Sequence, residues 1–441
     1  MQVTADHVNH IKQLLEGNSL SPFPLDPDKV AVLKSPEDFY QSLLELISHS
    51  KDRISLSSLY LGVDDQESAL VQRLRFQIHK TPSLAINFVL DYHRAQRRDP
   101  NLRNSFTCLE PLVADRSPRF RLHLYRSPLF SPYHNLLGER IKEVIGVQHT
   151  KLYVFDDTVI ISGANLSRSY FTNRQDRYYQ ITDRHLANYV HELVACIGNA
   201  SFSYVYGETA LSPPVNPLSL QNLPGISSAY ARSSRGSNTW IFPAIQLGCI
   251  NVRLDERALF SVLRSISVKE CSLTLASGYF NPVSSLEKHL KTCDSTILTA
   301  SPMANAFFNA QGVSKFIPHV YSAIEQRFLS QKNRVNKVSL MEYSRHGWSY
   351  HQKGIWIRPS SNTAPFLSVL GSSNFGYRSL EKDLECQFYL MTSDEDLRQK
   401  MTQELDNVGN YMAPITNETF NTNRRITMPI RLLTRAIRSW L

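Results

Sequence analysis

The stretch 149–176, HTKLYVFDDTVIISGANLSRSYFTNRQD, carries a chemical pattern that occurs twice in the chain. His149, Lys151 and Asp156 give the spacing H-x-K-x4-D. In a strand, residues two positions apart face the same side, so the imidazole of His149 and the ammonium of Lys151 are expected to point together. Asn165 follows in a turn of small residues, where backbone N–H groups can approach an anion.

A second copy of this pattern lies at 351–385. Its members are His351, Lys353, Asn374 and Glu385. In both copies the asparagine precedes an acidic residue by 11 positions, from 165 to 176 and from 374 to 385. The second copy takes 23 positions from histidine to asparagine against 16 in the first, and the extra residues coincide with the turn-rich PSSNTAP at 359–365. The second copy is therefore expected to form the same hairpin with a longer loop.

The two copies differ at two positions that bear on the chemistry. Arg358 stands where the second motif would have its aspartate, so that copy is H-x-K without the acid. Gly163 occupies the turn position that is Ser372 in the second copy. A hydroxyl ligand to phosphate is therefore expected on one side of the site only.

Two histidines, two lysines and two asparagines that face each other predict a pocket for a tetrahedral phosphoryl group. The lysines and asparagines would neutralise and hydrogen-bond its nonbridging oxygens. One neutral imidazole can attack phosphorus while the other, protonated, donates to the leaving oxygen. Asp176 and Glu385 are each expected to accept a histidine Nδ1–H and so to fix tautomer and orientation. Because fixed cations neutralise the phosphate, the pattern calls for no metal ion and no cofactor.

The composition indicates a folded, globular protein with anionic partners. The 441 residues can form two domains of about 200 residues, each with a proper core. The net charge of +9 favours nucleic acid, an acidic membrane surface or phosphorylated substrates, without choosing between them. Six cysteines without C-x2-C pairs argue against a zinc site and fit a reducing compartment. The sequence has no apolar run of about 18 residues, so no membrane span is expected. The N-terminus lacks the enrichment in Arg and Ser that is typical of a transit peptide.

The order of expected elements restarts in the middle of the chain. Helices are expected at 36–49, 65–79, 183–199, 255–270, 316–332 and 393–412, and extended segments at 54–60, 84–94, 120–127, 271–280, 295–300 and 337–343. We predict an α/β fold of two duplicated α/β/α domains with pseudo-two-fold symmetry and one shared active site. The expected divisions are an N-terminal domain 1–206, a linker or surface loop 207–239, a C-terminal domain 240–415 and a basic segment 416–441.

The C-terminal segment predicts a basic amphipathic helix. Apolar residues gather on one side of a helical wheel, namely Ile426, Ile430, Leu433, Ile437, Trp440 and Leu441, and Arg424, Arg431, Arg435 and Arg438 gather on the other. Such a helix suits the interface of an anionic bilayer or docking onto the protein's own body, and both possibilities stay open. The loop 127–137, SPLFSPYHNLL, is a second candidate for membrane contact, with ordinary packing as its alternative.

The doubled motif resembles the phospholipase D superfamily, whose members carry two such His-Lys motifs. Longer strings, among them SPMANAFFNAQGVSKFIPHVY at 301–321 and GSSNFGYRSLEKDLE at 371–385, are similar to the mitochondrial phosphatidylglycerophosphate synthases of that superfamily. The similarity covers most of residues 30–415. It implies two phospholipase D-like domains and peripheral association with the mitochondrial inner membrane. Members of this group resemble the chain in lacking the aspartate of the second motif, whose place Arg358 takes here.

The resemblance implies phosphatidyl transfer from CDP-diacylglycerol to glycerol 3-phosphate through a phosphohistidine. The family's N-terminal histidine usually attacks phosphorus, so His149 is the expected nucleophile and His351 the expected general acid and then base. The reverse assignment stays open. Further candidates for substrate binding are Tyr60, Arg94, Tyr279, Asn281, Arg345 and Arg378, of which Arg94 follows a strand end, where the ligand-binding loops of α/β sheets lie.

Three alternative functions differ from this one in substrate or in class. The first is another phosphatidyltransferase or a hydrolase on the same scaffold, such as a cardiolipin synthase, a phosphatidylserine synthase or a phospholipase D. The second is a nucleic-acid phosphodiesterase, although no Lys/Arg run interleaved with aromatic residues predicts a groove that tracks a strand. The third is an inactive lipid-binding module, which the intact histidine and lysine pairs disfavour.

Overall fold

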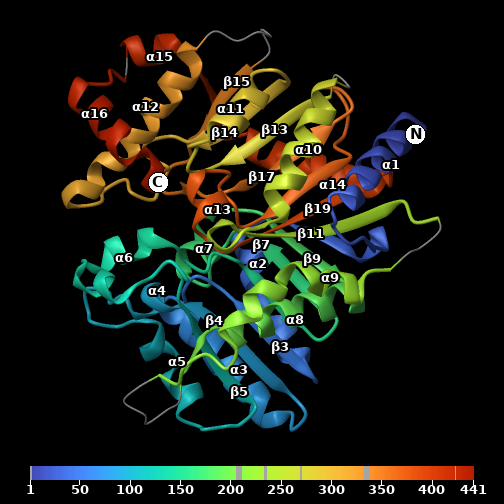
Figure 1. The fold of residues 1–441 in the computed structure, drawn as a ribbon, viewed down its shortest axis with the longest axis vertical. Helices are drawn as coiled ribbons and strands as arrows, with labels where there is room; N and C mark the ends of the chain where they lie inside the picture. The colour runs from blue at the N-terminus through green and yellow to red at the C-terminus, as the bar shows by residue number, and fades with distance from the viewer. Residues whose placement is uncertain (1, 205–210, 233–235, 269–270, 332–337, 423) are drawn as a thin grey trace.

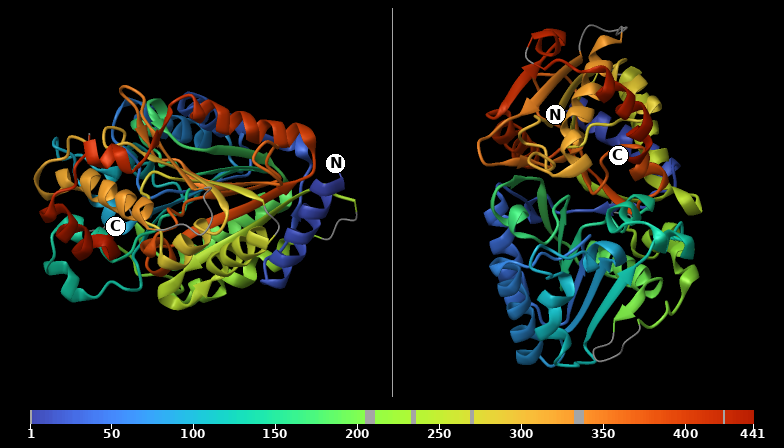
Figure 2. Two further views of the ribbon diagram at one scale, coloured as in Figure 1. Left: turned by 90° about the horizontal axis from the view of Figure 1, so that it is seen from above. Right: turned by 90° about the vertical axis from the view of Figure 1, so that its left-hand side faces the viewer.

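The computed structural model describes residues 2–204, 211–232, 236–268, 271–331, 338–422 and 424–441. These residues form two α/β halves stacked one on the other, the first from blue to green and the second from yellow to red (Figure 1). The right-hand view of Figure 2 shows the same two layers from the side. Each half is built around one mixed sheet.

The first sheet runs in the order β10-β5-β4-β3-β6-β7-β9-β2. Its strands are β2 (Val30–Leu33), β3 (Arg53–Ser57), β4 (Ala85–Asp91), β5 (Phe120–Tyr125), β6 (Leu152–Phe155), β7 (Thr158–Ser162), β9 (Tyr178–Thr182) and β10 (Phe202–Tyr204). β3, β4 and β5 are parallel neighbours, and the motif hairpin β6–β7 joins them antiparallel in the middle of the sheet. Both faces of this hairpin are buried, which is why its strands are continuous apolar runs.

The second sheet has the order β1-β11-β19-β18-β17-β13-β14-β15-β20, and β12 pairs with β11. Read from β20 to β1, this order repeats that of the first sheet with equivalent strands. Its strands are β1 (Phe23–Pro24), β11 (Thr239–Leu247), β12 (Val252–Arg253), β13 (Ser272–Ser277), β14 (Asp294–Ala300), β15 (Val338–Tyr343), β17 (Lys353–Arg358), β18 (Leu367–Gly371), β19 (Glu385–Thr392) and β20 (Met412–Ile415). The hairpin β17–β18 takes the place of β6–β7, with the predicted longer loop at 359–365. The duplicated α/β fold is thereby confirmed.

Helices cover both faces of each sheet. On one face lie α2 (Pro36–His49), α3 (Asp65–Lys80) and α5 (Ser105–Val113) in the first half, and α10 (Leu254–Val268), α11 (Ser284–Leu290) and α12 (Ile317–Ser330) in the second. On the other face lie α8 (Arg184–Asn199) and α14 (Glu395–Gly409), whose apolar residues belong to one buried cluster that continues from one half into the other. Side chains of Ser35, Asp183 and Asp394 cap α2, α8 and α14.

The first residues of the chain lie with the second half, although the sequence analysis placed residues 1–206 in the N-terminal domain. Figure 1 shows α1 (Gln2–Gly17) beside α10. Val8, Ile11 and Leu15 of α1 are buried in the same cluster as Trp240. β1 extends the second sheet by pairing with β11. The apolar side of α1 is thereby buried against the second half.

The stretch expected as a linker is partly structured. Within its described part, η3 (Pro217–Asn222) and α9 (Leu223–Tyr230) lie against α8, with Leu220 and Leu223 buried. The order of the second half then begins with β11. Residues 205–210 and 233–235 of this region lie outside the described residues.

The C-terminal segment forms α15 (Asn417–Thr422), α16 (Met428–Ile437) and η6 (Arg438–Trp440). The apolar side of α16 packs on the protein's own body, because Leu433, Ile437 and Leu441 lie against Tyr321 and its neighbours on α12. This side of the helix thus docks on the protein's own body, as one of the two expectations had it, and membrane contact of the segment stays a prediction. The large apolar side chains exposed here are instead Met428, Leu432 and Trp440.

Candidate active site

Two short ladders, one on each side of the pseudo-two-fold axis, join the motif of one half to the acidic segment of the other. β16 (Ser349–Tyr350) pairs in parallel with β8 (Arg174–Gln175), and the backbone N–H of His351 donates to Gln175. In the equivalent place Gln148 bridges in parallel to Leu384, and the N–H of His149 donates to Leu384. Each ladder therefore places a histidine of one half opposite the carboxylate of the other.

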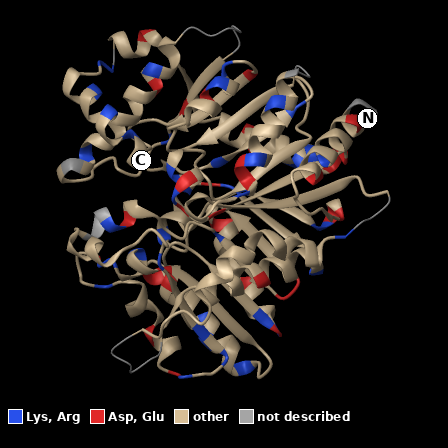
Figure 3. Ribbon diagram, in the orientation of Figure 1, with Lys and Arg blue, Asp and Glu red and all other residues tan. Residues whose placement is uncertain are grey.

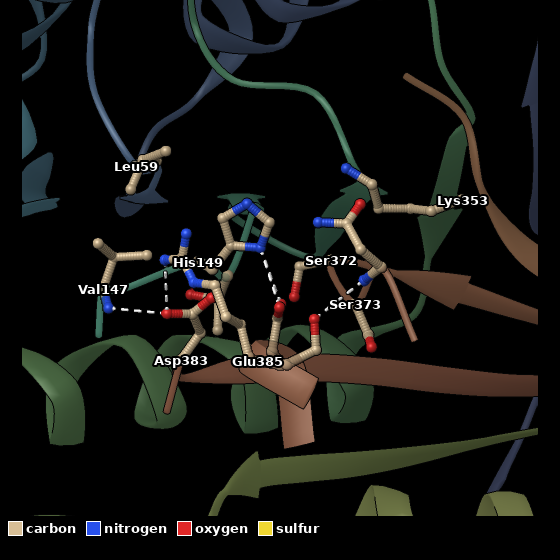
Figure 4. Close-up of polar contacts among 12 residues, drawn as sticks. Leu59, Val147, His149, Lys353, Ser372, Ser373, Asp383 and Glu385 are labelled. Atoms are coloured by element: carbon tan, nitrogen blue, oxygen red, sulfur yellow. Dashed lines mark hydrogen bonds and ion pairs between the residues drawn. The ribbon is translucent and has the colours of Figure 1, made fainter. Parts of the chain in front are cut away.

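His149 is oriented by a carboxylate from the second half. Its Nδ1 lies 3.0 Å from both carboxylate oxygens of Glu385, which begins β19 (Figure 4). Both side chains are buried, Glu385 completely. Because a carboxylate only accepts hydrogen bonds, Nδ1 carries the proton and Nε2 is the nitrogen available for chemistry.

His351 is oriented in the mirrored way by a carboxylate from the first half. Its Nδ1 lies 2.7 Å from Oδ2 of Asp176. Its Nε2 lies 3.1 Å from the hydroxyl of Tyr170, which also accepts a hydrogen bond of 3.1 Å from Nδ2 of Asn165. Sequence reasoning missed Tyr170, and the only signal for it was its position inside the segment between Asn165 and Asp176.

The two motif lysines are buried beside the histidines. Nζ of Lys353 lies 3.2 Å from Nε2 of His351, and Nζ of Lys151 donates to the backbone carbonyl of His149 at 2.5 Å. Burial lowers the pKa of Lys353 to about 8 and holds the pKa of Lys151 well below its ordinary value, with Lys353 adding to the second effect. Two ammonium groups this close repel each other, so the site is built to receive an anion.

The imidazoles are poised as neutral bases. Burial lowers the pKa of both histidines, and the charges of Lys353, Lys151 and His149 add to the lowering for His351. The charge of one histidine contributes to the lowered pKa of the other, which agrees with a single shared site. Burial raises the pKa of Asp176 to about 6, whereas the same effect on Glu385 is outweighed by His149 and Lys151, so the pKa of Glu385 is lowered.

The turn positions differ for a steric reason. A Cβ on Gly163 would lie 2.6 Å from Oδ1 of Asp176, so only glycine lets this carboxylate reach His351. In the second copy the hydroxyl of Ser372 accepts from the N–H of Cys386 at 3.1 Å. Oδ1 of Asn374 is buried without a hydrogen-bond partner in the described structure, whereas Oδ1 of Asn165 accepts from the N–H of Leu59.

Asp156 lies apart from these groups. It sits in the β6–β7 turn with φ 49°, at the end of β6 remote from His149. Its carboxylate accepts hydrogen bonds of 2.8 to 3.0 Å from the backbone N–H groups of Lys51, Asp52 and Arg53. The expected catalytic role of Asp156 is corrected to a structural one, because its oxygens brace the hairpin against the start of β3.

Three of the substrate-binding candidates line the region near His351. The ring of Tyr279 stands edge-on to the His351 imidazole at 5.6 Å. The guanidinium of Arg94 lies 4.4 Å over the ring of Tyr60, and both border a cavity of about 800 Å³ that Arg97 also lines. Tyr60 and Arg94 thus share one cavity and Tyr279 lies beside His351, and their role in substrate binding stays a prediction.

The other three candidates are held by protein groups. Asn281 exchanges two hydrogen bonds with the C-terminal Arg438, of 2.7 and 3.0 Å. The guanidinium of Arg345 is sandwiched between Trp348 and Tyr411. Arg378 bonds to the carboxylate of Asp383 and to the carbonyl of Glu143, both at 3.0 Å. Asn281 and Arg345 thus make structural contacts, Arg378 lies beside the His149 ladder, and the substrate-binding role of all three stays a prediction.

The described part of the chain shows neither a metal-binding cluster nor a membrane-spanning helix. No group of three or more His, Cys, Asp or Glu side chains there is arranged as metal ligands would be. No described helix has the length and apolar character needed to cross a membrane.

Curated relatives carry one enzyme name. No family model matches the chain. It is 34% identical to a probable CDP-diacylglycerol–glycerol-3-phosphate 3-phosphatidyltransferase of Dictyostelium discoideum, over 93% of this chain and 77% of that protein. It is 33% identical to the mitochondrial CDP-diacylglycerol–glycerol-3-phosphate 3-phosphatidyltransferase of Gallus gallus, over 96% of this chain and 85% of that one. The chain belongs to this family.

The fold of this phosphatidyltransferase also occurs in a solved structure. Phosphatidylserine synthase of Haemophilus influenzae covers 99% of the chain, and the chain covers all of it, with a TM-score of 0.78 at 20% identity. The resemblance to phosphatidylglycerophosphate synthases inferred from the motifs is thus confirmed. Among the alternatives, a nucleic-acid enzyme and an inactive lipid-binding module gain no support from these relatives.

Proposed function

We propose that the protein transfers a phosphatidyl group from CDP-diacylglycerol to glycerol 3-phosphate, giving phosphatidylglycerophosphate and CMP through a phosphohistidine. The observation that carries this proposal is the crossed arrangement of the two histidines. Each imidazole has its Nδ1 held by a carboxylate of the opposite half, at 3.0 Å for His149 and 2.7 Å for His351. Two buried lysines lie beside them, as stabilisation of a phosphoryl transition state requires.

In the first step, Nε2 of His149 attacks the phosphorus atom that bears diacylglycerol. The new N–P bond forms as the P–O bond to CMP breaks, and His351 donates a proton to the leaving oxygen. In the second step His351 takes the proton of the sn-1 hydroxyl of glycerol 3-phosphate. That oxygen attacks phosphorus, the N–P bond breaks, and its electrons return to His149.

Three features favour His149 as the nucleophile. Its Nε2 makes no hydrogen bond among the described residues, whereas Nε2 of His351 faces the hydroxyl of Tyr170. A phosphohistidine ring is positively charged, and the lowered pKa of Glu385 keeps an anion beside it, although burial alone would raise that pKa. His149 is also the more exposed of the two, at 9% against 5%.

Trapping of the covalent adduct tests this assignment. Enzyme quenched with CDP-diacylglycerol labelled in the phosphatidyl phosphate is expected to carry the label on the peptide that contains His149. His149→Ala should abolish the adduct, whereas His351→Ala should still form it slowly. Label on the His351 peptide would reverse the assignment, and a competent enzyme without label would remove the phosphohistidine from the mechanism.

The acceptor separates this function from phosphatidylserine synthesis and from hydrolysis. CMP release is expected to depend on glycerol 3-phosphate and not on serine or on a second lipid. Release at an equal rate without any acceptor would instead mean a phospholipase. The cavity beside Tyr60 and Arg94 is the proposed place of the polar substrate parts, because the cationic side chains of Arg94, Arg97 and Arg98 line it.

The proposal includes peripheral binding to an anionic membrane, as its lipid substrate requires. Exposed apolar side chains at 127–137 support it, with Tyr133 84% and Leu136 90% exposed. On the C-terminal segment Leu432 and Trp440 are exposed beside the basic face of α16, whose Lys/Arg positions are blue in Figure 3. By analogy with the mitochondrial relatives, we place the enzyme on the mitochondrial inner membrane.

Vesicle flotation tests the membrane surface. Leu136→Ser and the pair Leu432→Ser and Trp440→Ser are expected to lower binding to vesicles rich in anionic lipid several-fold, and to leave the thermal midpoint unchanged. Ala436→Ser, an exposed position on α16, serves as the control. Wild-type binding by both variants would locate the membrane surface elsewhere. Fractionation of organelles tests the location.

A further inference from the structure

The pseudo-two-fold repeat breaks at one charged position beside the two histidines. Arg174 and Asp383 each stand nine positions after the turn asparagine, from 165 to 174 and from 374 to 383. Each also occupies the same place in its ladder, Arg174 opposite Ser349 and Asp383 just before the Gln148–Leu384 bridge. Equivalent positions near equivalent histidines therefore carry opposite charges.

The aspartate side of this pair is closed by protein groups. Oδ1 of Asp383 accepts from the backbone N–H of Val147 at 3.1 Å, and from Arg378 at 3.0 Å (Figure 4). This carboxylate and its arginine neutralise each other beside His149. On the His149 side of the site, the guanidinium of Arg378 is thus compensated by a carboxylate.

The arginine side is open. Arg174 donates from Nε to the hydroxyl of Ser349 at 3.0 Å, and its guanidinium lies 4.5 Å over the ring of Tyr170. Tyr170 in turn contacts Nε2 of His351. Among the described residues, no carboxylate comes within ion-pairing distance of Arg174. A half-buried guanidinium without a paired anion is a site prepared for one.

Arg174 lies on the same side of the site as Tyr279, whose ring stands edge-on to the His351 imidazole at 5.6 Å. Burial raises the pKa of the Tyr279 hydroxyl, and the guanidinium groups of Arg174 and Arg94 both oppose this shift. Arg94 borders the cavity of about 800 Å³. Cationic and aromatic side chains, namely Arg174, Tyr170 and Tyr279, thus gather beside His351.

We propose that Arg174 binds a phosphate group of the substrate that occupies the His351 side. This inference rests on the proposed function. With His149 attacking, both the departing CMP and the incoming glycerol 3-phosphate bind opposite it, on the side of His351, and both are phosphate monoesters. The diacylglycerol part carries no second phosphate, which agrees with the closed pair at Asp383 and Arg378. Arg174 is thus a specificity-determining residue for a phosphorylated acceptor, a phosphorylated leaving group or both.

The test is a pair of kinetic measurements on Arg174→Gln and Arg174→Lys, with Arg168→Gln as the matched control. Arg168 is an exposed arginine on the neighbouring helix α7 (Arg168–Thr172). One arm measures KM for glycerol 3-phosphate, and the other measures inhibition by CMP. Arg174→Gln is expected to raise KM, the inhibition constant for CMP, or both by about 10- to 100-fold, since a charge-assisted hydrogen bond is lost.

The outcomes separate the two sources of phosphate. A change in KM alone assigns Arg174 to the acceptor, and a change in CMP inhibition alone assigns it to the nucleotide. Arg174→Lys should lie between the wild type and Arg174→Gln, because it keeps the charge without the planar fork. If both constants stay at wild-type values in a folded Arg174→Gln protein, the inference is wrong. If the wild type itself makes no phosphatidylglycerophosphate, the proposed function fails instead.

Discussion

At the scale of the residue, the site is an exchange of carboxylates between two halves of one chain. Glu385 serves His149 and Asp176 serves His351, so neither half holds a complete catalytic pair. The sequence predicted these four residues and the Nδ1 contact. It did not predict the exchange, because spacing along one copy contains no information about the contact of one copy with the other.

Replacing each carboxylate by its amide is expected to give two distinguishable defects. Glu385→Gln and Asp176→Asn should each lower kcat by about 10²- to 10⁴-fold, since each amide disturbs one imidazole. The adduct on His149 should be lost in Glu385→Gln and should persist longer in Asp176→Asn, where deprotonation of the acceptor is impaired. Rapid-quench labelling checks both. Equal adduct lifetimes in the two variants would contradict the pairing.

The dependence of kcat/KM on pH is expected to report the titration of the Lys353 ammonium group. Its pKa is lowered to about 8, chiefly by burial, so the ammonium is present below that pH and is lost above it. We therefore expect kcat/KM for CDP-diacylglycerol to fall above about pH 8. Lys353→Arg should lower the rate but shift this alkaline limb to higher pH, because a guanidinium stays charged. An alkaline limb that stays in place in Lys353→Arg would exclude Lys353 as its source.

Asp156 is expected to contribute to stability and not to catalysis. Asp156→Asn keeps a residue type that tolerates positive φ but turns an amide donor toward backbone N–H groups. The free energy of unfolding should fall by about 1–3 kcal/mol. The kcat of the folded fraction should stay within about threefold of the wild type. A threefold change corresponds to a change in activation free energy of about 0.7 kcal/mol, since about 1.4 kcal/mol corresponds to a tenfold change. A loss of kcat without a loss of stability would restore the catalytic role.

At the scale of the element, the N-terminal helix packs on the second half of the molecule and not on the first half, which follows it directly in sequence. α1 and β1 precede the first sheet in sequence but complete the second, where α1 packs on α10. Apolar residues at helical spacing define the buried side of α1, yet the pattern does not say which half receives it. The boundary expected for the N-terminal domain failed here for that reason.

Leu15→Ala tests the energetic contribution of α1. Leu15 is fully buried between the helix and the second half, so its truncation should cost about 2–5 kcal/mol of unfolding free energy. Gln13→Ala, at an exposed position of the same helix, should be nearly neutral. Denaturant titration measures both. A neutral Leu15→Ala would mean that α1 does not dock on the second half in solution.

At the scale of the whole molecule, the two halves are fastened by a buried polar cluster next to the site. Arg177, directly after Asp176, makes two hydrogen bonds of 2.8 and 2.9 Å to Glu404 on α14. Its guanidinium also lies 3.8 Å over the ring of Trp356. Charged positions of both signs meet where the halves join, as Figure 3 shows. Fixing the halves fixes the distance between the two histidines.

Glu404→Gln is expected to loosen this junction. It leaves the buried charge of Arg177 without its partner, at a cost of about 3–5 kcal/mol of unfolding free energy. The surface pair of Arg184 and Asp157, 3.9 Å apart, supplies the control, since Asp157→Asn should cost less than about 1 kcal/mol. Denaturant midpoints compare the two variants. Similar small costs for both would show that the cluster does not hold the halves together.

The sequence alone determined the chemical set, the doubled α/β order and the family resemblance, because residue types and local spacing are properties of one continuous segment. Only the tertiary structure decided which carboxylate serves which histidine, that Asp156 is a brace and that α1 joins the second half. It also decided that Arg174 stacks on Tyr170 with no carboxylate partner among the described residues. Each of these is a contact between segments far apart in the chain. Such contacts follow from the packing of whole faces, and no local pattern encodes them.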